Sequence, residues 1–354
     1  MLKFFRQIRQ KLIEQENVRK YVWYALGEIL LVVIGILLAL QVNNWNEQRK
    51  AEESLKIVLK EVQEDLYNDL VEISLALDWH IEKDSISTRM IENRYDIKDF
   101  ENPENEYLFN TALSYYDIII SDRSFQLLSD FKDRVPAEYR GIIKRLNNLY
   151  IEDQAYLNRV QDMIIVFTMD YKNNVFNTHE WATPSPDWPS EEWIRYFSED
   201  TYHKRKLFRY RSDIRGLIGY AKRMKDKAVT NYMIIRSLLN DDSELPKFVK
   251  DYGMKERPSS LNYAGIYEYS NEDGAVDQVQ INELYDVFVL QYINDRAMFY
   301  FSEILLAETA PDMLQFALDS RVKIEVIRDS TGAIEKLKTT SPDNDDQEYY
   351  PLEQ

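Results

Sequence analysis

One apolar run limits what this chain can fold into more than any other feature of its sequence. Residues 22–42 read VWYALGEILLVVIGILLALQV, and Glu28 is their only charged residue. At a rise of ~1.5 Å per residue, a helix of this length covers ~30 Å, which is the thickness of the hydrocarbon core of a bilayer. The run therefore predicts one transmembrane helix over 22–42.

A cleaved signal peptide is the competing interpretation of this run. Signal peptides have a short basic start and end in small residues that a peptidase can cleave. Here a long segment, residues 1–21, precedes the run, and Gln41, Val42 and Asn43 stand where small residues would be needed. The sequence favours a retained anchor.

The flanks of the run predict its orientation. Residues 1–21 carry six Lys or Arg, whereas the first positive charge on the other side is Arg49. Basic flanks stay in the cytoplasm, and aromatic rings mark the two membrane surfaces. We expect a basic amphipathic tail over 1–21 on the cytoplasmic leaflet, and a main domain on the opposite side of the membrane. The aromatic residues expected at the membrane surfaces are Tyr21, Trp23, Tyr24 and Trp45.

Two features inside the run have more than one interpretation. Glu28 lies about one turn from the membrane surface, where it either reaches the headgroups or is protonated, or else contacts another helix or relays protons. Gly35 and Ala39 form a small-xxx-small pair, which allows two helices to approach closely. This pair is compatible with a homodimer, but such pairs often arise by chance.

The uneven charge of the chain excludes one class of partner. Residues 1–42 hold six of the 44 Lys and Arg and three of the 61 Asp and Glu, so the rest of the chain holds 38 and 58. Affinity for nucleic acid comes mainly from Lys and Arg that neutralise phosphates, so we expect no nucleic-acid partner. The absence of cysteine excludes disulfides, thiolate metal ligands and cysteine nucleophiles.

Residues 45–250 have the pattern of an extracytoplasmic helical bundle. An apolar stripe repeats every eleven residues, which keeps it on one face of a nearly straight helix. The stripe is either one wall of an intramolecular bundle or a surface for self-association. Further helical periods at 105–131, 137–175 and 200–240 predict that the bundle is antiparallel. The stripe consists of Leu55, Leu59, Val62, Leu66, Leu70, Ile73, Leu77 and Ile81.

A loop is predicted over residues 179–193, HEWATPSPDWPSEEW, because its prolines interrupt any helix. We expect this loop at the end of the bundle nearer the membrane. Its tryptophans, Trp181, Trp188 and Trp193, either pin the loop to the bundle or form an exposed contact surface.

After Pro258 the apolar period changes from 3.6 residues to 2, which is typical of strands. Residues 258–340 predict a C-terminal antiparallel β meander of about seven short strands that curls into a barrel or half-barrel. The polar segment MKERPSS, residues 254–260, is the expected boundary of this β module. Residues 341–354 are acidic and predict a poorly ordered tail.

The segment GEILLVVIGILLALQVNNWNEQRK, residues 27–50, follows a basic MLKFFRQIRQKL start. Together they resemble the N-terminal signature of an uncharacterised family of single-pass bacterial membrane proteins. The segment SDRSFQLLSDF, residues 121–131, stands where that family has its second helix. The resemblance implies an anchor in a bacterial inner membrane and an extracytoplasmic helical domain, which places the main domain in the periplasm. It implies no activity.

A second resemblance concerns the β module. Tyr263-Ala-Gly265-Ile-Tyr267 and the later Asp329-Ser-Thr-Gly332-Ala-Ile334, with Leu337, are similar to the first and last strands of a small β domain in penicillin-recognising serine hydrolases. In those enzymes this domain is an accessory module that follows the catalytic domain. The hydrolase domain is not upstream here, so no catalytic residue is carried over.

No catalytic, cofactor-binding or metal-binding motif stands out. The three histidines, His80, His179 and His203, lack the spacings of metal sites, and no glycine-rich phosphate loop or G-x-S-x-G elbow is present. We therefore expect a non-enzymatic binding, sensing or scaffold protein that needs no cofactor. Its expected partners are the lipid bilayer and an unidentified envelope protein or ligand. Two alternatives stay open: a receptor or accessory subunit that signals through a separate partner, and a periplasmic hydrolase with an unrecognised site.

Overall fold

The protein is described by a computed structural model that divides into two compact units. Met1–Ile57 with Phe131–Ala137 form one unit, and Val58–Asp130 with Glu138–Gln354 form the other. Helix α2 (Val18–Ile91) has 74 residues and passes from the first unit into the second. The structure describes residues 18–131, 135–182, 189–254, 261–270, 276–285, 287–293, 303–317, 319–342 and 344–352.

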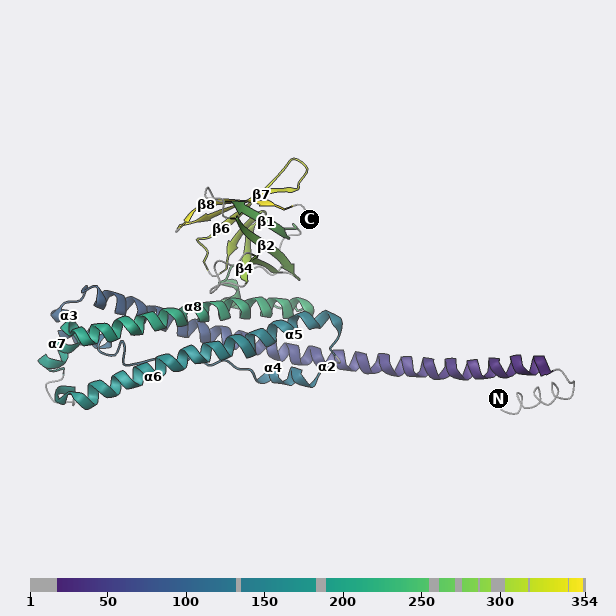
Figure 1. Ribbon diagram of the computed structural model, residues 1–354, viewed down its shortest axis with the longest axis horizontal. Coiled ribbons are helices and arrows are strands. Elements are labelled where there is room, and N and C mark those ends of the chain that lie inside the picture. The colour runs from purple at the N-terminus through teal and green to yellow at the C-terminus, as the bar shows by residue number, and fades with distance from the viewer. Residues whose placement is uncertain are drawn as a thin grey trace. The chain divides into compact units, whose positions relative to one another are not determined.

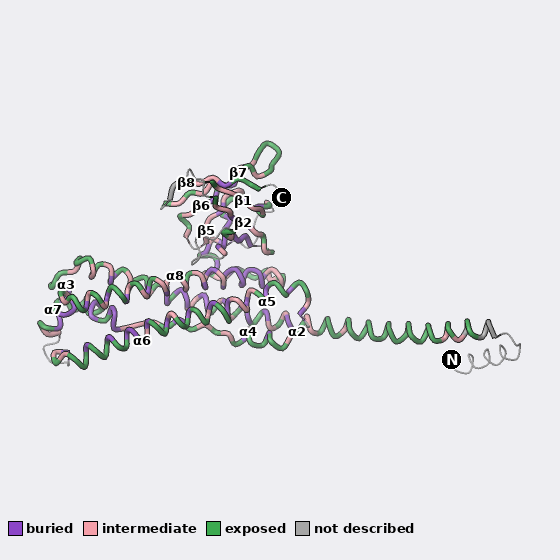
Figure 2. Tube along the Cα trace, viewed as in Figure 1, coloured by how far each residue is buried: buried purple, intermediate pink, exposed green. Residues whose placement is uncertain are grey.

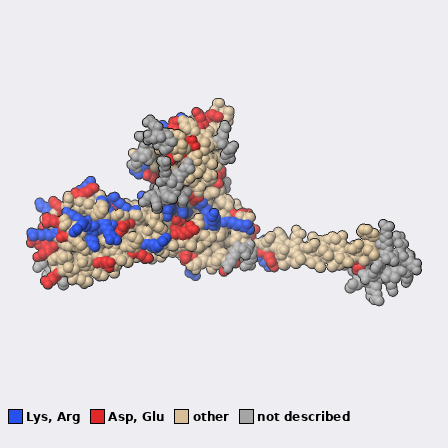
Figure 3. Space-filling view, viewed as in Figure 1, with Lys and Arg blue, Asp and Glu red and all other residues tan. Residues whose placement is uncertain are grey.

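The apolar run lies within α2 and is exposed along its length (Figure 2). In the most apolar stretch of eighteen residues no residue is buried, and Leu31 is 68% exposed. Figure 3 shows this stretch as a surface almost without Lys, Arg, Asp or Glu. The expectation of one helix with the length and composition to cross a membrane is confirmed.

Three long helical stretches form the interior of a bundle in the second unit (Figure 1). The first is the remainder of α2, and the third is α8 (Thr201–Leu238). The second is one continuous stretch made of α5 (Arg140–Asn147), the π-helical turn η5 (Asn148–Asp153) and α6 (Gln154–Thr178). Helices are therefore confirmed where the periods at 137–175 and 200–240 predict them. The short helices are α3 (Ile97–Glu101), η1 (Pro103–Leu108), α4 (Arg123–Leu127), η2 (Leu128–Asp130), η4 (Ala137–Tyr139), η6 (Glu180–Ala182), α7 (Glu191–Glu199) and α9 (Lys247–Lys250).

The apolar stripe of α2 is buried within the chain. Its members from Leu59 to Leu77 are at most 5% exposed, which confirms the interpretation as one wall of a bundle. Ile81 is the exception, with 44% of its surface exposed. At ~100° per residue, Ile81 lies about 80° away from Leu55 around the helix, whereas His80 lies only about 20° away and takes the interior position.

The expected helix over 105–131 is wrong. Residues 114–122 belong to no helix or strand, and only short helical turns flank them. Their sequence, SYYDIIISD, concentrates aromatic and β-branched side chains, which lose rotamer freedom in a helix and suit an extended backbone. A helical spacing of apolar residues was outweighed here by the local preference of the backbone.

Side chains from the long helices supply the hydrogen bonds that the extended segment 114–122 would make in a sheet. Gln161 of α6 acts like a neighbouring strand, because its Oε1 accepts the Ile118 N–H at 2.7 Å and its Nε2 donates to the Ile118 carbonyl at 3.2 Å. His80 of α2 donates from Nε2 to the Tyr116 carbonyl at 3.0 Å. Buried backbone groups need such partners, so these polar side chains are part of the bundle interior.

The C-terminal region is a closed antiparallel barrel in which each strand pairs with the next along the chain and β8 pairs with β1. Closure removes the unpaired strand edges that an open meander leaves. The strands are β1 (Gly265–Ser270), β2 (Val276–Leu284), β3 (Val287–Tyr292), β4 (Ile304–Ala310), β5 (Met313–Phe316), β6 (Lys323–Arg328), β7 (Ile334–Ser341) and β8 (Asn344–Pro351).

The structure corrects the expected C-terminal tail. Residues 344–351 are not a loose end but form β8, which completes the barrel through the pairs Tyr267–Pro351 and Glu268–Tyr350. The acidic composition misled the prediction, because Asp346 and Glu348 alternate along the strand with Gln347 and Tyr349, and Tyr349 faces the core. Eight strands are present in the described part of this region, where about seven were expected.

Two short motifs in the barrel have structural explanations. Tyr267 donates its hydroxyl to the Tyr263 carbonyl at 2.8 Å, and this places its ring over Gly265, where a Cβ would lie only 3.1 Å from the Tyr267 oxygen. Asp329 accepts hydrogen bonds from the backbone N–H of Thr331 and Ala333 at 2.8 and 3.0 Å and so shapes the turn between β6 and β7. Both motifs specify local backbone geometry.

Candidate functional site

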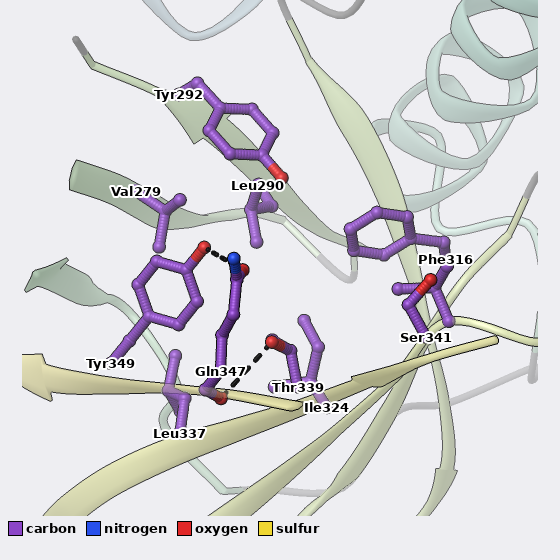
Figure 4. Close-up of a pocket in the computed structure, with 11 residues that line it drawn as sticks. Val279, Leu290, Tyr292, Phe316, Ile324, Leu337, Thr339, Ser341, Gln347 and Tyr349 are labelled. Atoms are coloured by element: carbon purple, nitrogen blue, oxygen red, sulfur yellow. Dashed lines mark hydrogen bonds between the residues drawn. The ribbon is translucent and has the colours of Figure 1, made fainter. Parts of the chain in front are cut away.

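The barrel contains a cavity of about 110 Å³ (Figure 4). Its walls come from β2, β3, β5, β6, β7 and β8 and from one residue just before β6. The lining residues are Val279, Leu290, Tyr292, Phe316, Val322, Ile324, Leu337, Thr339, Ser341, Gln347 and Tyr349.

Strand alternation and register bring these side chains together. Residues two apart on a strand face the same side, so Leu337, Thr339 and Ser341 of β7 all line the cavity. The β7–β8 register then places Thr339 opposite Gln347, another lining residue. Leu337 is 1% exposed whereas Tyr292 is 37% exposed, so the cavity grades from an apolar floor to a more polar rim.

The polar groups of the cavity form a small network. Tyr349 donates its hydroxyl to Gln347 Oε1 at 3.0 Å, and Thr339 donates to the Gln347 backbone carbonyl at 3.3 Å. Gln347 Nε2 makes no hydrogen bond with the described part of the chain. Both of its N–H groups are therefore available to a molecule in the cavity.

The cavity carries no net charge. Among the described residues that line it, none is an acid, lysine, arginine or histidine. Burial raises the pKa of Tyr349 and of Tyr292, so both phenols stay protonated at neutral pH. A site of this kind has no general acid or base near pH 7, but it can hold a small neutral molecule.

The sequence predicted strands here but not a cavity. The change to period 2 after Pro258 was visible, yet period 2 does not show which face of a strand lies inside a barrel. Gln347 and Tyr349 were assigned to the tail and so were not considered.

The structure places the expected membrane-surface residues on α2. Trp23 and Trp45 are 69% and 63% exposed, and Glu28 is half-exposed. Gly35 and Ala39 are exposed, with no atom within 4 Å of a Cβ built on Gly35. The side chains of Tyr21 and Tyr24, and all of residues 1–17, lie outside the described residues. Membrane contact and pairing through Gly35 and Ala39 stay predictions.

The expected tryptophan loop differs from its prediction. Trp193 is not in a loop but in α7, where it is 2% exposed, and Trp181 is half-buried against it with ring centroids 5.4 Å apart. Trp188 lies outside the described residues. Helix α7 packs on α3, and α3 follows the end of α2 at Ile91. This is the end of α2 that is farther from the apolar run. The prediction that the loop lies at the end of the bundle nearer the membrane is therefore wrong.

Beside this tryptophan pair lies a buried polar group. His203 of α8 is 1% exposed, and its Nδ1 lies 2.5 Å from the Tyr171 hydroxyl of α6. Burial lowers the pKa of His203 to about 3, so the ring is neutral at pH 7. No group of three or more His, Cys, Asp or Glu side chains suited to a metal ion is found among the described residues.

The barrel packs on the bundle through the outer faces of β3 and β4, both of which contact α8. Val289 and Leu305 point away from the barrel core, yet each is 1% exposed. Polar contacts accompany this apolar one. Asp226 of α8 accepts the Leu305 N–H at 2.9 Å, and Arg145 of α5 forms a bidentate pair with Glu303 at 2.8 and 2.6 Å. The expected boundary at 254–260 falls mainly on residues outside the described ranges and stays a prediction.

Comparison with known proteins gives one match. The sequence profile of a family described as a family of unknown function (DUF6090) matches residues 28–130, which include most of the apolar run, the stripe of α2 and the extended segment 114–122. This is consistent with the resemblance to an uncharacterised family, and the barrel lies outside the matched range. No curated protein and no solved structure matches the chain.

Proposed function

We propose that the protein is a single-pass inner-membrane protein whose periplasmic part binds a small molecule in its β-barrel. The observation that carries the proposal is the uncharged cavity inside a closed eight-stranded barrel. Barrels of this size either fill their interior with side chains or hold one small ligand. Here the described side chains leave a cavity in the barrel interior, and the two N–H groups of the Gln347 side chain face this cavity.

Membrane anchoring is supported by the exposure and the flanks of α2. An exposed apolar stretch of this length would associate non-specifically in water, whereas in a bilayer it needs no protein cover. The excess of Lys and Arg before the stretch supports a cytoplasmic N-terminus. On this proposal the barrel stands on the periplasmic side.

A binding function is favoured over an enzymatic one by the position of the titratable groups. Asp69 is buried and accepts hydrogen bonds from the Ser121 N–H and the Tyr150 hydroxyl at 2.9 and 3.0 Å. His80 holds the extended segment 114–122, and Asp226 holds β4. These groups serve to join parts of the fold, and none of them lines the barrel cavity.

A receptor or accessory role is the second candidate, and the continuity of α2 favours it. This helix runs unbroken from the apolar stretch to the interior of the bundle. A rigid helix can carry a small displacement across a membrane to a separate partner, since helix shifts of ~1–2 Å are a common form of signal. This role adds to small-molecule binding and does not replace it.

The orientation is tested by reporters fused after Gln354. A reporter active only in the periplasm should be active, and one active only in the cytoplasm should not. The opposite result would show that the barrel is on the other side of the membrane.

Binding is tested on the full chain purified from its membranes. Denaturation and mass spectrometry should release a small molecule from the wild type but not from Thr339→Phe, whose added ring fills the cavity. Thr340→Phe is the matched control, because it adds the same ring to the exposed face of the same strand. A molecule released equally from both variants would place the binding site elsewhere.

A further inference from the structure

The chemistry of the cavity also specifies its ligand. This inference rests on the proposed binding function and goes beyond it. We infer that the barrel selects a neutral molecule with a compact apolar head and a hydrogen-bond acceptor of the carbonyl type, and that Gln347 is the residue that recognises the acceptor.

The volume limits the size of the buried head. An apolar cavity of ~150 Å³ accommodates benzene, and water occupies ~30 Å³ in the liquid. The 110 Å³ found here holds an apolar group of about four to six non-hydrogen atoms, with any remainder of the molecule extending past the rim at Tyr292. The floor made by Leu337, Ile324 and Val279 has no polar side chain, so the head is apolar.

Electrostatics limit the charge of the ligand. Moving an ion from water into a site without a partner charge is strongly unfavourable, and no lining side chain offers such a charge. The surroundings are also acidic, since residues 261–354 carry nineteen Asp or Glu against six Lys or Arg. Anions are disfavoured by both the cavity and its surroundings, and cations find no carboxylate inside it.

Gln347 decides what kind of polar group the ligand carries. Figure 4 shows its amide in the middle of the lining side chains, with Tyr349 on one side and Phe316 across the gap. Its oxygen is already used by the Tyr349 hydroxyl at 3.0 Å, so the group that remains is the NH₂, which only donates. A donor that faces a cavity selects an acceptor, and a bound molecule without an acceptor would leave the NH₂ without a partner.

Three ring compounds of similar size test the inference on the full chain in detergent. They are cyclohexanone, which is neutral and has an acceptor, and its charged counterparts cyclohexylammonium and cyclohexanecarboxylate. Titrations followed by NMR should show cyclohexanone binding to the wild type and to Thr340→Phe, with a dissociation constant of about a millimolar, the range expected for so few atoms. Thr339→Phe should abolish binding, and neither ion should bind to any variant.

Two further variants isolate the role of Gln347. Gln347→Leu should weaken cyclohexanone binding about tenfold, which corresponds to the loss of one hydrogen bond. Tyr350→Phe is the matched control, because it removes a hydroxyl from an exposed residue of the same strand that does not line the cavity, and its affinity should stay within about twofold of the wild type. Thermal unfolding of both variants near the wild-type temperature shows that they are folded.

The outcomes separate this inference from the proposed function. Equal binding of the ions and cyclohexanone, or an unchanged affinity in Gln347→Leu, overturns the ligand class. Release of a charged molecule from the purified wild type, absent from Thr339→Phe, also overturns the class but supports binding in the barrel. If cyclohexanone does not bind and no molecule is released, both the ligand class and the binding function are wrong.

Discussion

Replacement of Asp226 by Asn should stabilise the protein at neutral pH and leave it nearly unchanged in acid. Asp226 is 2% exposed, its Oδ2 accepts the Leu305 N–H, and its Oδ1 has no partner among the described residues. Burial raises its pKa from 3.8 to about 7, against the opposing effect of the Leu305 N–H. Glu303 raises it slightly further and Arg145 lowers it. The Asp226 carboxyl therefore ionises in the folded protein only near neutral pH and above, and at a cost to the folded state.

The size and sign of the effect follow from the two pKa values. Below pH 4 the carboxyl is protonated in both the folded and the unfolded chain, so its ionisation does not affect stability. Between about pH 4 and pH 7 the unfolded chain loses the proton first, so stability falls as the pH rises. At ~1.4 kcal/mol per unit, the shift from 3.8 to about 7 corresponds to about 4 kcal/mol. Asn keeps an oxygen for the Leu305 N–H but has no charge, so this loss should be absent in the variant.

The assay is urea unfolding of the full chain in detergent, followed by circular dichroism at several pH values. Asp69, His80 and His203 also have shifted pKa values in this range. These groups are the same in the wild type and in Asp226→Asn, so their effects on stability cancel when the two unfolding free energies are subtracted. The difference between Asp226→Asn and wild type should grow by about 4 kcal/mol from pH 4 to pH 7.5. A difference that stays constant with pH would refute the reasoning, since it would mean that Asp226 has an ordinary pKa.

Three other predictions concern the packing of the fold. Leu66→Asp with Leu70→Asp should unfold the bundle, because each buries an unpaired charge that costs several kcal/mol, whereas Leu75→Asp at a 52% exposed site of the same helix should keep the wild-type circular dichroism. Gln161→Leu should lower the free energy of unfolding by about 2–4 kcal/mol, because both backbone groups of Ile118 lose their partner; an unchanged urea midpoint would contradict this role. Gly265→Ala should lower the free energy of unfolding by about 1–2 kcal/mol, since the Tyr267 hydroxyl is held by its own hydrogen bond and cannot easily move away; an unchanged melting temperature in calorimetry would show that the ring yields.

The parts of the fold that the sequence predicted are those with a long, regular pattern. The stripe from Leu59 to Leu77 repeats over many turns, so its burial follows from periodicity alone. The change of period near Pro258 likewise marks the start of the barrel region, because period 2 persists over several segments. The apolar run needed only its length and composition.

The parts that were missed depend on contacts between distant residues. Local preference favours the extended segment 114–122, but its buried backbone groups also need Gln161 and His80, and neither residue is near it in the sequence. Residues 344–351 form a strand because β1 and β7 flank them, although their composition is that of a tail. The cavity follows from barrel closure, so no local pattern could have revealed it.

The extended segment 114–122 has a consequence for the order in which the bundle folds. Its contacts join residues 36, 43 and 96 positions apart, through Tyr116 with His80, Ile118 with Gln161 and Ser114 with Tyr210. Helices form from neighbouring residues in about a microsecond, but closing such long loops is slower and costs more chain entropy. Pulse-labelling hydrogen exchange should therefore find the Ile118 amide protected later than the amides of α6 and α8. We therefore expect the extended segment 114–122, rather than the helices, to set the rate at which this bundle matures.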